Sequence, residues 1–145
     1  AKRQIAWGLS QCDILKIADN ELEFMTGETD FYKGAAILQQ KYPNIKVLNV
    51  TAGADGSYSF YGEEEPVFVP SFKLGGTIET TGAGDTFCAS VLNFVLENGI
   101  ACLTPEDRKA MLRFANAAAY IVPTRKGAIR SMPERSEVEA LLAAN

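Results

Sequence analysis

Residues 79–89, ETTGAGDTFCA, combine a glycine-rich turn with one acid at the start of an apolar stretch. Gly82 and Gly84 have no Cβ, so the backbone can turn tightly and successive amides can point at one spot. The apolar residues that continue to Leu96 predict a buried helix whose N-terminus presents unpaired amides to an anion. Asp85 lies in the first turn of that helix, where a carboxylate can cap the helix or accept a proton from a hydroxyl. The segment predicts phosphate chemistry, and a plain glycine turn before a core helix is the alternative.

Two further segments have residue types that suit magnesium and a nucleotide. Asn20 and Glu23 are three residues apart, so an amide and a carboxylate share one helix face, and their oxygens suit magnesium and phosphate. The same pair also fits a capped helix start. Residues 51–56, TAGADG, follow a predicted strand at its carboxyl end, where open α/β sheets bind ligands. Glycines there permit the close approach of a nucleotide, and they are also typical of a hairpin turn.

The composition is that of an ordinary globular domain. The 145 residues include 14 Lys and Arg against 18 Asp and Glu, a net charge of −4, and the basic residues are spread along the chain. Nucleic acid is therefore not expected as a partner. No apolar run reaches membrane-spanning length, so no membrane association is expected. The three cysteines are far apart, which favours free thiols in a reducing compartment. The N-terminal residues lack a signal-peptide core, and we expect a cytoplasmic protein.

Helical and strand patterns alternate along the chain. Strands are predicted at residues 13–18 and 46–51. Residues 57–61 and 67–69 flank a glycine and three glutamates, which predicts a hairpin with a solvated tip. Helices are predicted at residues 3–10, 20–25, 30–41, 85–96, 105–122 and 133–143. This alternation predicts an α/β domain with a mostly parallel sheet and one β-hairpin. Because the predicted strands are few, we expect the sheet to be incomplete.

The order of these segments resembles the ribokinase-like carbohydrate kinases, also called the PfkB family. NxxE and a TG loop are followed by a strand into TxGxxG, a hairpin, TTGAGDTF, FANAAA and TRKGA. The resemblance covers nearly the whole chain and implies the C-terminal part of a three-layer α/β/α fold. Because members of the family are much longer, we expect residues 1–145 to be the nucleotide-binding and catalytic part, without the N-terminal sugar-binding half and its lid.

The resemblance implies an enzyme that transfers the γ-phosphoryl group of ATP to a hydroxyl of a small sugar. Asp85 matches the family's general base, and the backbone amides of Gly82, Ala83 and Gly84 match its anion hole. Such a transfer needs positioning, a cluster of charge-stabilising donors and one base. The chain has no histidine. A carboxylate suffices as the base, because a sugar alcohol loses its proton late in the reaction.

The resemblance also implies sites for ATP, Mg²⁺ and K⁺. Asn20 and Glu23 match the motif that organises magnesium and the phosphates, with Glu23 reaching the metal through water. Thr81 and Gly127 match positions whose carbonyls hold a monovalent cation in many members. The nucleotide contacts would come from one loop and one helix, namely from Thr51, Gly53, Gly56 and Asn116.

Several alternatives follow from the same residues. The run DILKIADNELEFMTG resembles the bacterial fructokinase branch, so fructose is the first expected substrate, with ribose and 2-keto-3-deoxygluconate next and adenosine less favoured. A homodimer of the full-length protein is left open. A noncatalytic nucleotide-binding fragment is the alternative of another class, and the fragment alone is expected to be inactive on sugars. A dinucleotide-binding domain is disfavoured, because no GxGxxG follows a first strand. Trp7 and Tyr120 are interpreted as packing residues, and Lys16 is the basic residue nearest the NxxE segment.

Overall fold

The computed structural model describes residues 2–73, 75–76, 80–127 and 129–145. The helices and strands predicted from the sequence are present, each with bounds within two residues of the expected ones. The strands are β1 (Ile14–Ala18), β2 (Val47–Thr51), β3 (Gly56–Tyr61) and β4 (Val67–Pro70). The helices are α1 (Lys2–Leu9), α2 (Asp19–Thr26), α3 (Phe31–Lys41), α4 (Ala83–Asn98), α5 (Pro105–Ile121) and α6 (Arg135–Ala144), with short 3-10 turns η1 (Val122–Thr124) and η2 (Ile129–Ser131).

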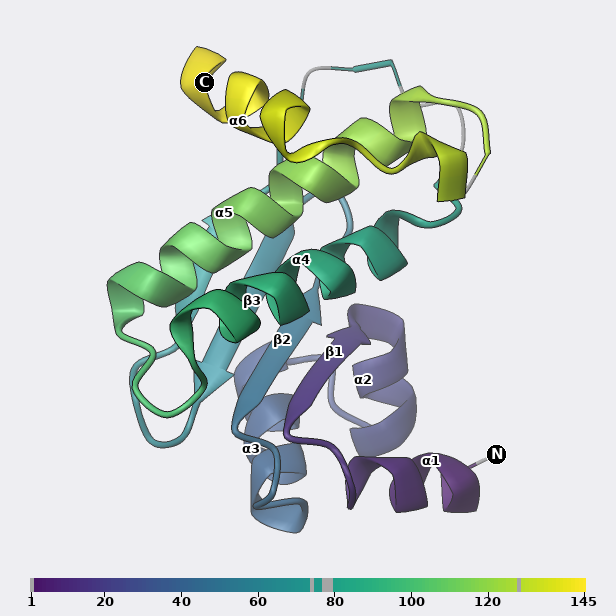
Figure 1. The fold of residues 1–145 in the computed structure, drawn as a ribbon. Helices are drawn as coiled ribbons and strands as arrows, with labels where there is room; N and C mark the ends of the chain where they lie inside the picture. Colours follow the sequence, from purple (N-terminus) through teal and green to yellow (C-terminus); the bar gives the residue numbers. More distant parts are fainter. Residues whose placement is uncertain (1, 74, 77–79, 128) are drawn as a thin grey trace.

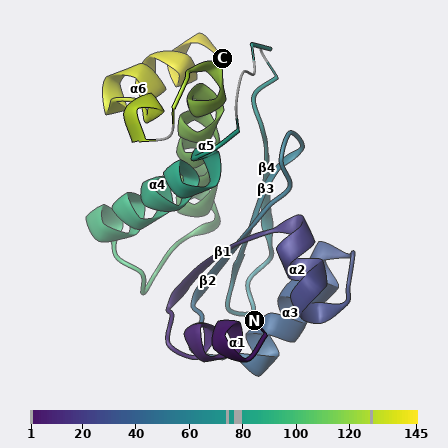
Figure 2. The same ribbon diagram turned by 90° about the vertical axis from the view of Figure 1, so that its right-hand side faces the viewer.

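The elements form three layers, as the sequence predicted. Helices α1, α2 and α3 cover one face of the sheet, and α4 and α5 cover the other, with α6 packed on the outer side of α5 (Figures 1 and 2). Strand β2 is buried on both faces, and its side chains alternate between two cores. Val47 packs with Phe87 and Met111 beneath α4 and α5, whereas Leu48 and Val50 pack on the side of α2 and α3.

The expectation of a mostly parallel sheet is wrong for the described strands. The order is β1-β2-β3-β4, and the only parallel pair among them is β1 with β2. A parallel pair needs a crossover connection, which α2 and α3 provide here. The other connections are short: four residues join β2 to β3 and five join β3 to β4, so both of these pairs are antiparallel.

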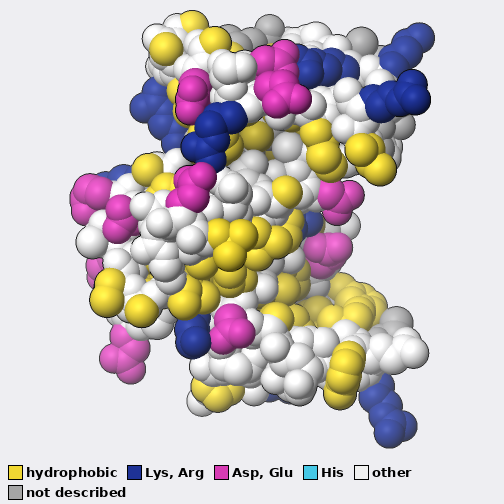
Figure 3. Space-filling view, viewed as in Figure 1, with side chains coloured by type: hydrophobic (Ala, Val, Ile, Leu, Met, Phe, Trp, Pro, Cys, Tyr) yellow, Lys and Arg dark blue, Asp and Glu magenta, His cyan; other side chains and the backbone are white. Residues whose placement is uncertain are grey.

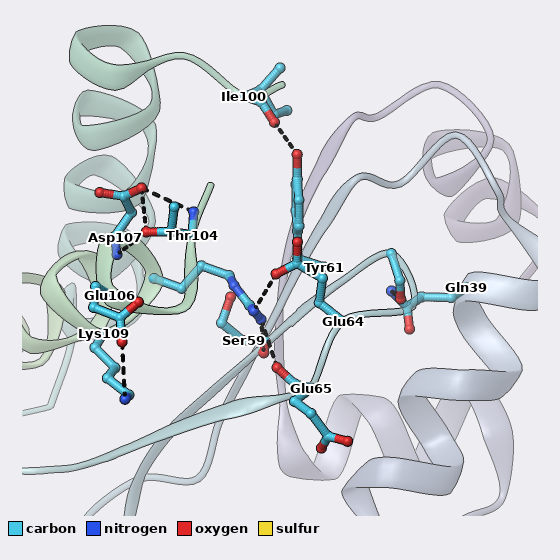
Figure 4. Close-up of polar contacts among 12 residues, drawn as sticks. Gln39, Ser59, Tyr61, Glu64, Glu65, Ile100, Thr104, Glu106, Asp107 and Lys109 are labelled. Carbon is cyan, nitrogen blue, oxygen red and sulfur yellow. Dashed lines mark hydrogen bonds and ion pairs between the residues drawn. The ribbon is translucent and has the colours of Figure 1, made fainter. Parts of the chain in front are cut away.

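A buried arginine attaches α5 to the hairpin of β3 and β4. The side chain of Arg108 has no exposed surface, and its guanidinium donates to the carbonyls of Ser59, at 3.3 Å, and Glu65, at 3.1 Å. Figure 4 labels these two acceptors and Glu64. It also pairs with the carboxylate of Glu64 at 2.8 Å. The expected solvated hairpin tip therefore contributes one of its glutamates to an ion pair. Arg108 thus joins the first turn of α5 to the hairpin.

One face of the molecule presents hydrophobic side chains around α4. Figure 3 shows them gathered across the middle of the view, where Figure 1 places α4. Leu92 and Leu96 of α4 are 44% and 86% exposed. In the described part of the chain, no helix has both the length and the apolar character needed to cross a membrane.

Candidate functional site

A cavity of about 310 Å³ lies beside the start of α4, at the lower end of the size range typical of small-molecule sites. Its walls come from the loop after β2, the segment after β4, the first turns of α4 and the C-terminal half of α5. Six of the residues predicted for the site line it, namely Thr51, Gly53, Gly56, Ala83, Gly84 and Asn116. Thr51 and Asn116, which are 65 residues apart in the sequence, are thus brought to one place.

A second, larger hollow of about 550 Å³ lies between α4, α5 and α6. It is lined by residues such as Phe94, Arg113 and Arg135, and none of the predicted site residues borders it. Size alone favours this hollow, but it is an open groove between three helices. The smaller cavity is the candidate site, because it contains the glycine turn and the helix N-terminus that can bind an anion.

The first turn of α4 has the geometry of an anion site. Gly82 precedes the helix in the left-handed conformation, with φ of 88°, which a residue with a Cβ rarely adopts. The amide of Ala83 donates to the carbonyl of Thr80 at 3.2 Å. Among the described residues, the amides of Gly84 and Asp85 have no acceptor, so they remain available to a ligand. Glu79, where the glycine-rich segment begins, is outside the described residues.

Asp85 occupies the third position of α4, and it is exposed. Within the described chain, its carboxylate makes no hydrogen bond or ion pair. It therefore does not cap its own helix, although a carboxylate in the first turn commonly does. The carboxylate is free to accept a proton from a group bound beside the amides.

Lys16 extends from β1 to the same turn of α4. A Cβ built on Gly84 would lie 3.2 Å from the ammonium nitrogen of Lys16, so the glycine leaves room for this cation. Cys88, one turn further along α4, responds to the same charges. Burial raises the pKa of its thiol, the charge of Lys16 lowers the pKa, and the charge of Asp85 raises it. A positive charge and unpaired amides thus lie together at the start of α4.

The structure brings Glu21, and not Glu23, next to Lys16. The carboxylate of Glu21 lies 3.9 Å from the ammonium nitrogen and accepts a hydrogen bond from the amide of Ala18 at 2.8 Å. Asn20 and Glu23 are exposed on α2, and neither lines the cavity. The sequence signal that marks Glu21 is its place three residues after the N-cap position, where an acid can cap the helix.

Asn116 has its side chain fully engaged by the protein. Its amide oxygen accepts from the hydroxyl of Ser57 at 2.9 Å. Its amide nitrogen donates to the carbonyls of Val69, at 3.1 Å, and Pro70, at 3.3 Å. Asn116 therefore forms a wall of the cavity by joining α5 to β3 and β4.

The end of the loop after β2 can lie close to β4 because Gly56 has no side chain. Its φ is 136°, and a Cβ there would lie 2.8 Å from the Cα of Pro70. Thr51 ends β2 and pairs with Ala18 on one side and Ser57 on the other. Gly53 is exposed, with φ of 51°. The loop thus exposes backbone to the cavity.

Thr81 and Gly127 are both exposed, and among the residues described no backbone hydrogen bond joins them. Gly127 has φ of 99°, and its carbonyl accepts a hydrogen bond from Ser131. Over the described ranges, no group of three or more Cys, Asp or Glu side chains is gathered as a metal site would require. Any magnesium bound here would need oxygen ligands from phosphate or water as well.

Comparison with known proteins identifies one family. The model of the pfkB family carbohydrate kinases matches residues 1–135. The chain is 35% identical over 142 residues to the probable fructokinase-2 of Arabidopsis thaliana, covering 98% of this chain and 42% of that protein. The chain thus spans less than half the length of this relative.

Solved structures give the same result. The ribokinase of Arabidopsis thaliana, complexed with ribose and ATP, is 34% identical, with a TM-score of 0.77 over 92% of this chain and 42% of that one. The fructokinase of Xylella fastidiosa with bound ATP is 26% identical, with a TM-score of 0.84 over 99% of this chain and 46% of that one. The chain belongs to the pfkB family of carbohydrate kinases.

Proposed function

We propose that this chain binds ATP in the cavity beside α4 and supplies the base that activates a sugar hydroxyl, as in a fructokinase. The observation that carries the proposal is at Gly84, which lines that cavity. Its amide and that of Asp85 have no acceptor among the described residues, and the ammonium of Lys16 lies beside Gly84. The fructokinase and ribokinase relatives support it, since both types of structure were solved with ATP.

The residues present account for the two demands of phosphoryl transfer. The amides, the helix dipole and Lys16 oppose the negative charge on the transferred group. As the sugar oxygen forms its bond to phosphorus, the bond from phosphorus to the ADP oxygen breaks, and the hydroxyl proton passes to the carboxylate of Asp85. The exposed, unpaired state of Asp85 suits this role.

We assign the magnesium and cation roles to the residues named from the sequence. When bound, Mg²⁺ would neutralise phosphate charge. Asn20 and Glu23 would hold its water ligands, and Glu21 is the carboxylate that the structure places beside Lys16. The carbonyls of Thr81 and Gly127 would hold a K⁺ ion. Their oxygen donors suit these hard cations.

The sugar site requires residues beyond those of the described fold. The chain spans 42% of its Arabidopsis relative, and among the described strands β1 has a neighbour on one side only. Leu92 and Leu96, four residues apart on one face of α4, are exposed. We propose that residues of the full-length protein outside this chain cover this apolar surface and bind fructose.

The test compares phosphorylation by this chain with that by the full-length protein that contains it. ADP release is followed with fructose, ribose and 2-keto-3-deoxygluconate. We expect turnover of the full-length protein on fructose and little or none by the 145-residue chain. Equal turnover by both would contradict the assignment of the sugar site to the missing part. Inactivity of the full-length protein on all three sugars, with ATP binding retained, would favour a noncatalytic nucleotide-binding protein.

A further inference from the structure

The hydroxyl of Tyr120 ties α5 to the segment that follows β4. It donates to the carbonyl of Gly75 at 2.6 Å, a contact that spans 45 residues of sequence. Gly75 and Gly76 have φ of 78° and 84°, conformations that favour glycine. The Tyr120 hydroxyl therefore holds Gly75 near the end of the helix.

Tyr120 belongs to the stripe of α5 that borders the cavity. Asn116, Ala119 and Tyr120 all line the cavity, and residues three and four apart share one side of a helix; Pro123 of η1 lines it just beyond the end of α5. The ring of Phe72 lies 6.1 Å from that of Tyr120, centroid to centroid, with 43° between the ring planes. Both rings line the same cavity. Tyr120 thus contacts this segment twice, through its hydroxyl at Gly75 and through its ring at Phe72.

The two ends of the cavity differ in chemistry. The end at α4 offers the Gly84 amide, with Lys16 beside it, and suits an anion. The end at α5 is walled by Phe72, Ala119, Tyr120 and Pro123, which suit a flat, apolar group. A nucleoside polyphosphate has both parts, a base and an anionic tail.

We infer that Tyr120 is a positioning residue for the nucleobase. Its hydroxyl holds the segment after β4 so that the rings of Phe72 and Tyr120 form one wall of the base pocket. This inference rests on the proposed nucleotide site. It adds the residues that would contact the base of the nucleotide. Tyr120, which the sequence suggested to be a packing residue, is half-buried at this wall.

The test removes one oxygen atom, by Tyr120→Phe, and keeps the ring. The matched control is Tyr61→Phe, because the hydroxyl of Tyr61 donates to the carbonyl of Ile100 at 2.8 Å, away from the cavity (Figure 4). Each variant loses one hydrogen bond from a phenol to a backbone carbonyl. Calorimetry on this chain measures the affinity for Mg-ATP and for Mg-tripolyphosphate, which has the anionic tail without the base.

We expect Tyr120→Phe to weaken Mg-ATP binding by roughly threefold to tenfold, the range for one hydrogen bond, and to leave tripolyphosphate binding unchanged. We also expect faster amide hydrogen exchange at residues 71–73, 75 and 76. Tyr61→Phe should change none of these.

Three outcomes would overturn the inference. Unchanged ATP affinity in Tyr120→Phe would remove the positioning role and leave the nucleotide site intact. An equal loss for ATP and tripolyphosphate would show an effect on the whole cavity and not on the base. An unaltered chain that binds neither ligand would refute the proposed function itself, and the inference with it.

Discussion

The substitution Gly84→Ala separates the stability of the fold from the function of the site. Gly84 is in the first turn of α4, and its φ is not among the positive values. Alanine is therefore compatible with the backbone, and replacing a helical glycine stabilises a helix by about 0.5–1 kcal/mol. The added Cβ would lie 3.2 Å from the ammonium nitrogen of Lys16, the far end of a flexible side chain that can move away. We expect a melting temperature unchanged or raised by up to about 3 °C.

The same methyl group would impair binding. It enters the space between the Gly84 amide and Lys16, where the phosphate is proposed to lie. Losing one hydrogen bond to a charged group costs about 1.5–3 kcal/mol, so the affinity for Mg-ATP should fall by about 10-fold to 150-fold. Calorimetric titration and a thermal melt of the same preparation measure both effects.

Gly8→Ala is the control for this experiment. Gly8 lies in α1, it is exposed, and a Cβ there would meet nothing within 4 Å. It should stabilise the chain slightly and leave the affinity unchanged. If Gly84→Ala bound Mg-ATP as tightly as the unaltered chain, the assignment of the phosphate site would be refuted. If it destabilised the fold by more than about 1 kcal/mol, the premise that Lys16 can yield would be wrong.

Three other perturbations test separate parts of the account. In the full-length protein, Asp85→Asn should lower turnover by orders of magnitude and retain ATP binding, and normal steady-state turnover would exclude Asp85 as the base. Gly56→Ala should destabilise the fold by more than about 2 kcal/mol in denaturant titration, because φ is 136° and the Cβ would collide with the backbone of Val69 and Pro70; a smaller loss would contradict the geometry of this loop. Hydrogen bonds from the hydroxyl and then the amide of Thr104 lower the pKa of Asp107 below its usual value near 3.8. A lowered carboxyl pKa stabilises the fold above the unfolded pKa, and this contribution is lost as the pH falls through the folded pKa. The difference in melting temperature between the unaltered chain and Asp107→Ala should therefore be present at neutral pH and shrink as the pH falls below the usual carboxyl value near 3.8. A difference that persisted in acid would show that the charge of Asp107 is not responsible.

The elements of the fold were predictable because each carries a local signal. The β-branched and apolar run of β2, the Pro105 start of α5 and the glycine that ends α2 are all visible in the sequence. The relative direction of the strands could not be predicted in this way, because it depends on which strands pair. One crossover and two short connections give one parallel pair, where the alternation of strands and helices suggested more.

The candidate site was predicted in part for the same reason. The glycine-rich loops can be recognised from their composition, and in the structure they line one cavity. The side chains of Lys16 and Glu21 come within 3.9 Å of each other because the end of β1 lies beside the start of α2. Their separation in the sequence does not predict this contact. The full burial of Arg108 has no sequence signal, since its acceptors are mostly backbone carbonyls. Trp7 was expected to pack, yet it is 71% exposed, because α1 turns Leu9 and not Trp7 into the core.

The central claim is that ATP binds in the cavity beside α4, and photolabelling with 8-azido-ATP tests it most directly. The label is activated on the chain in the presence of Mg²⁺, and the modified peptides are identified by mass spectrometry. We predict labelling within residues 51–56, 71–76 or 116–123, prevented by excess ATP. Labelling confined to the groove between α4, α5 and α6, or labelling that ATP does not prevent, would contradict the account.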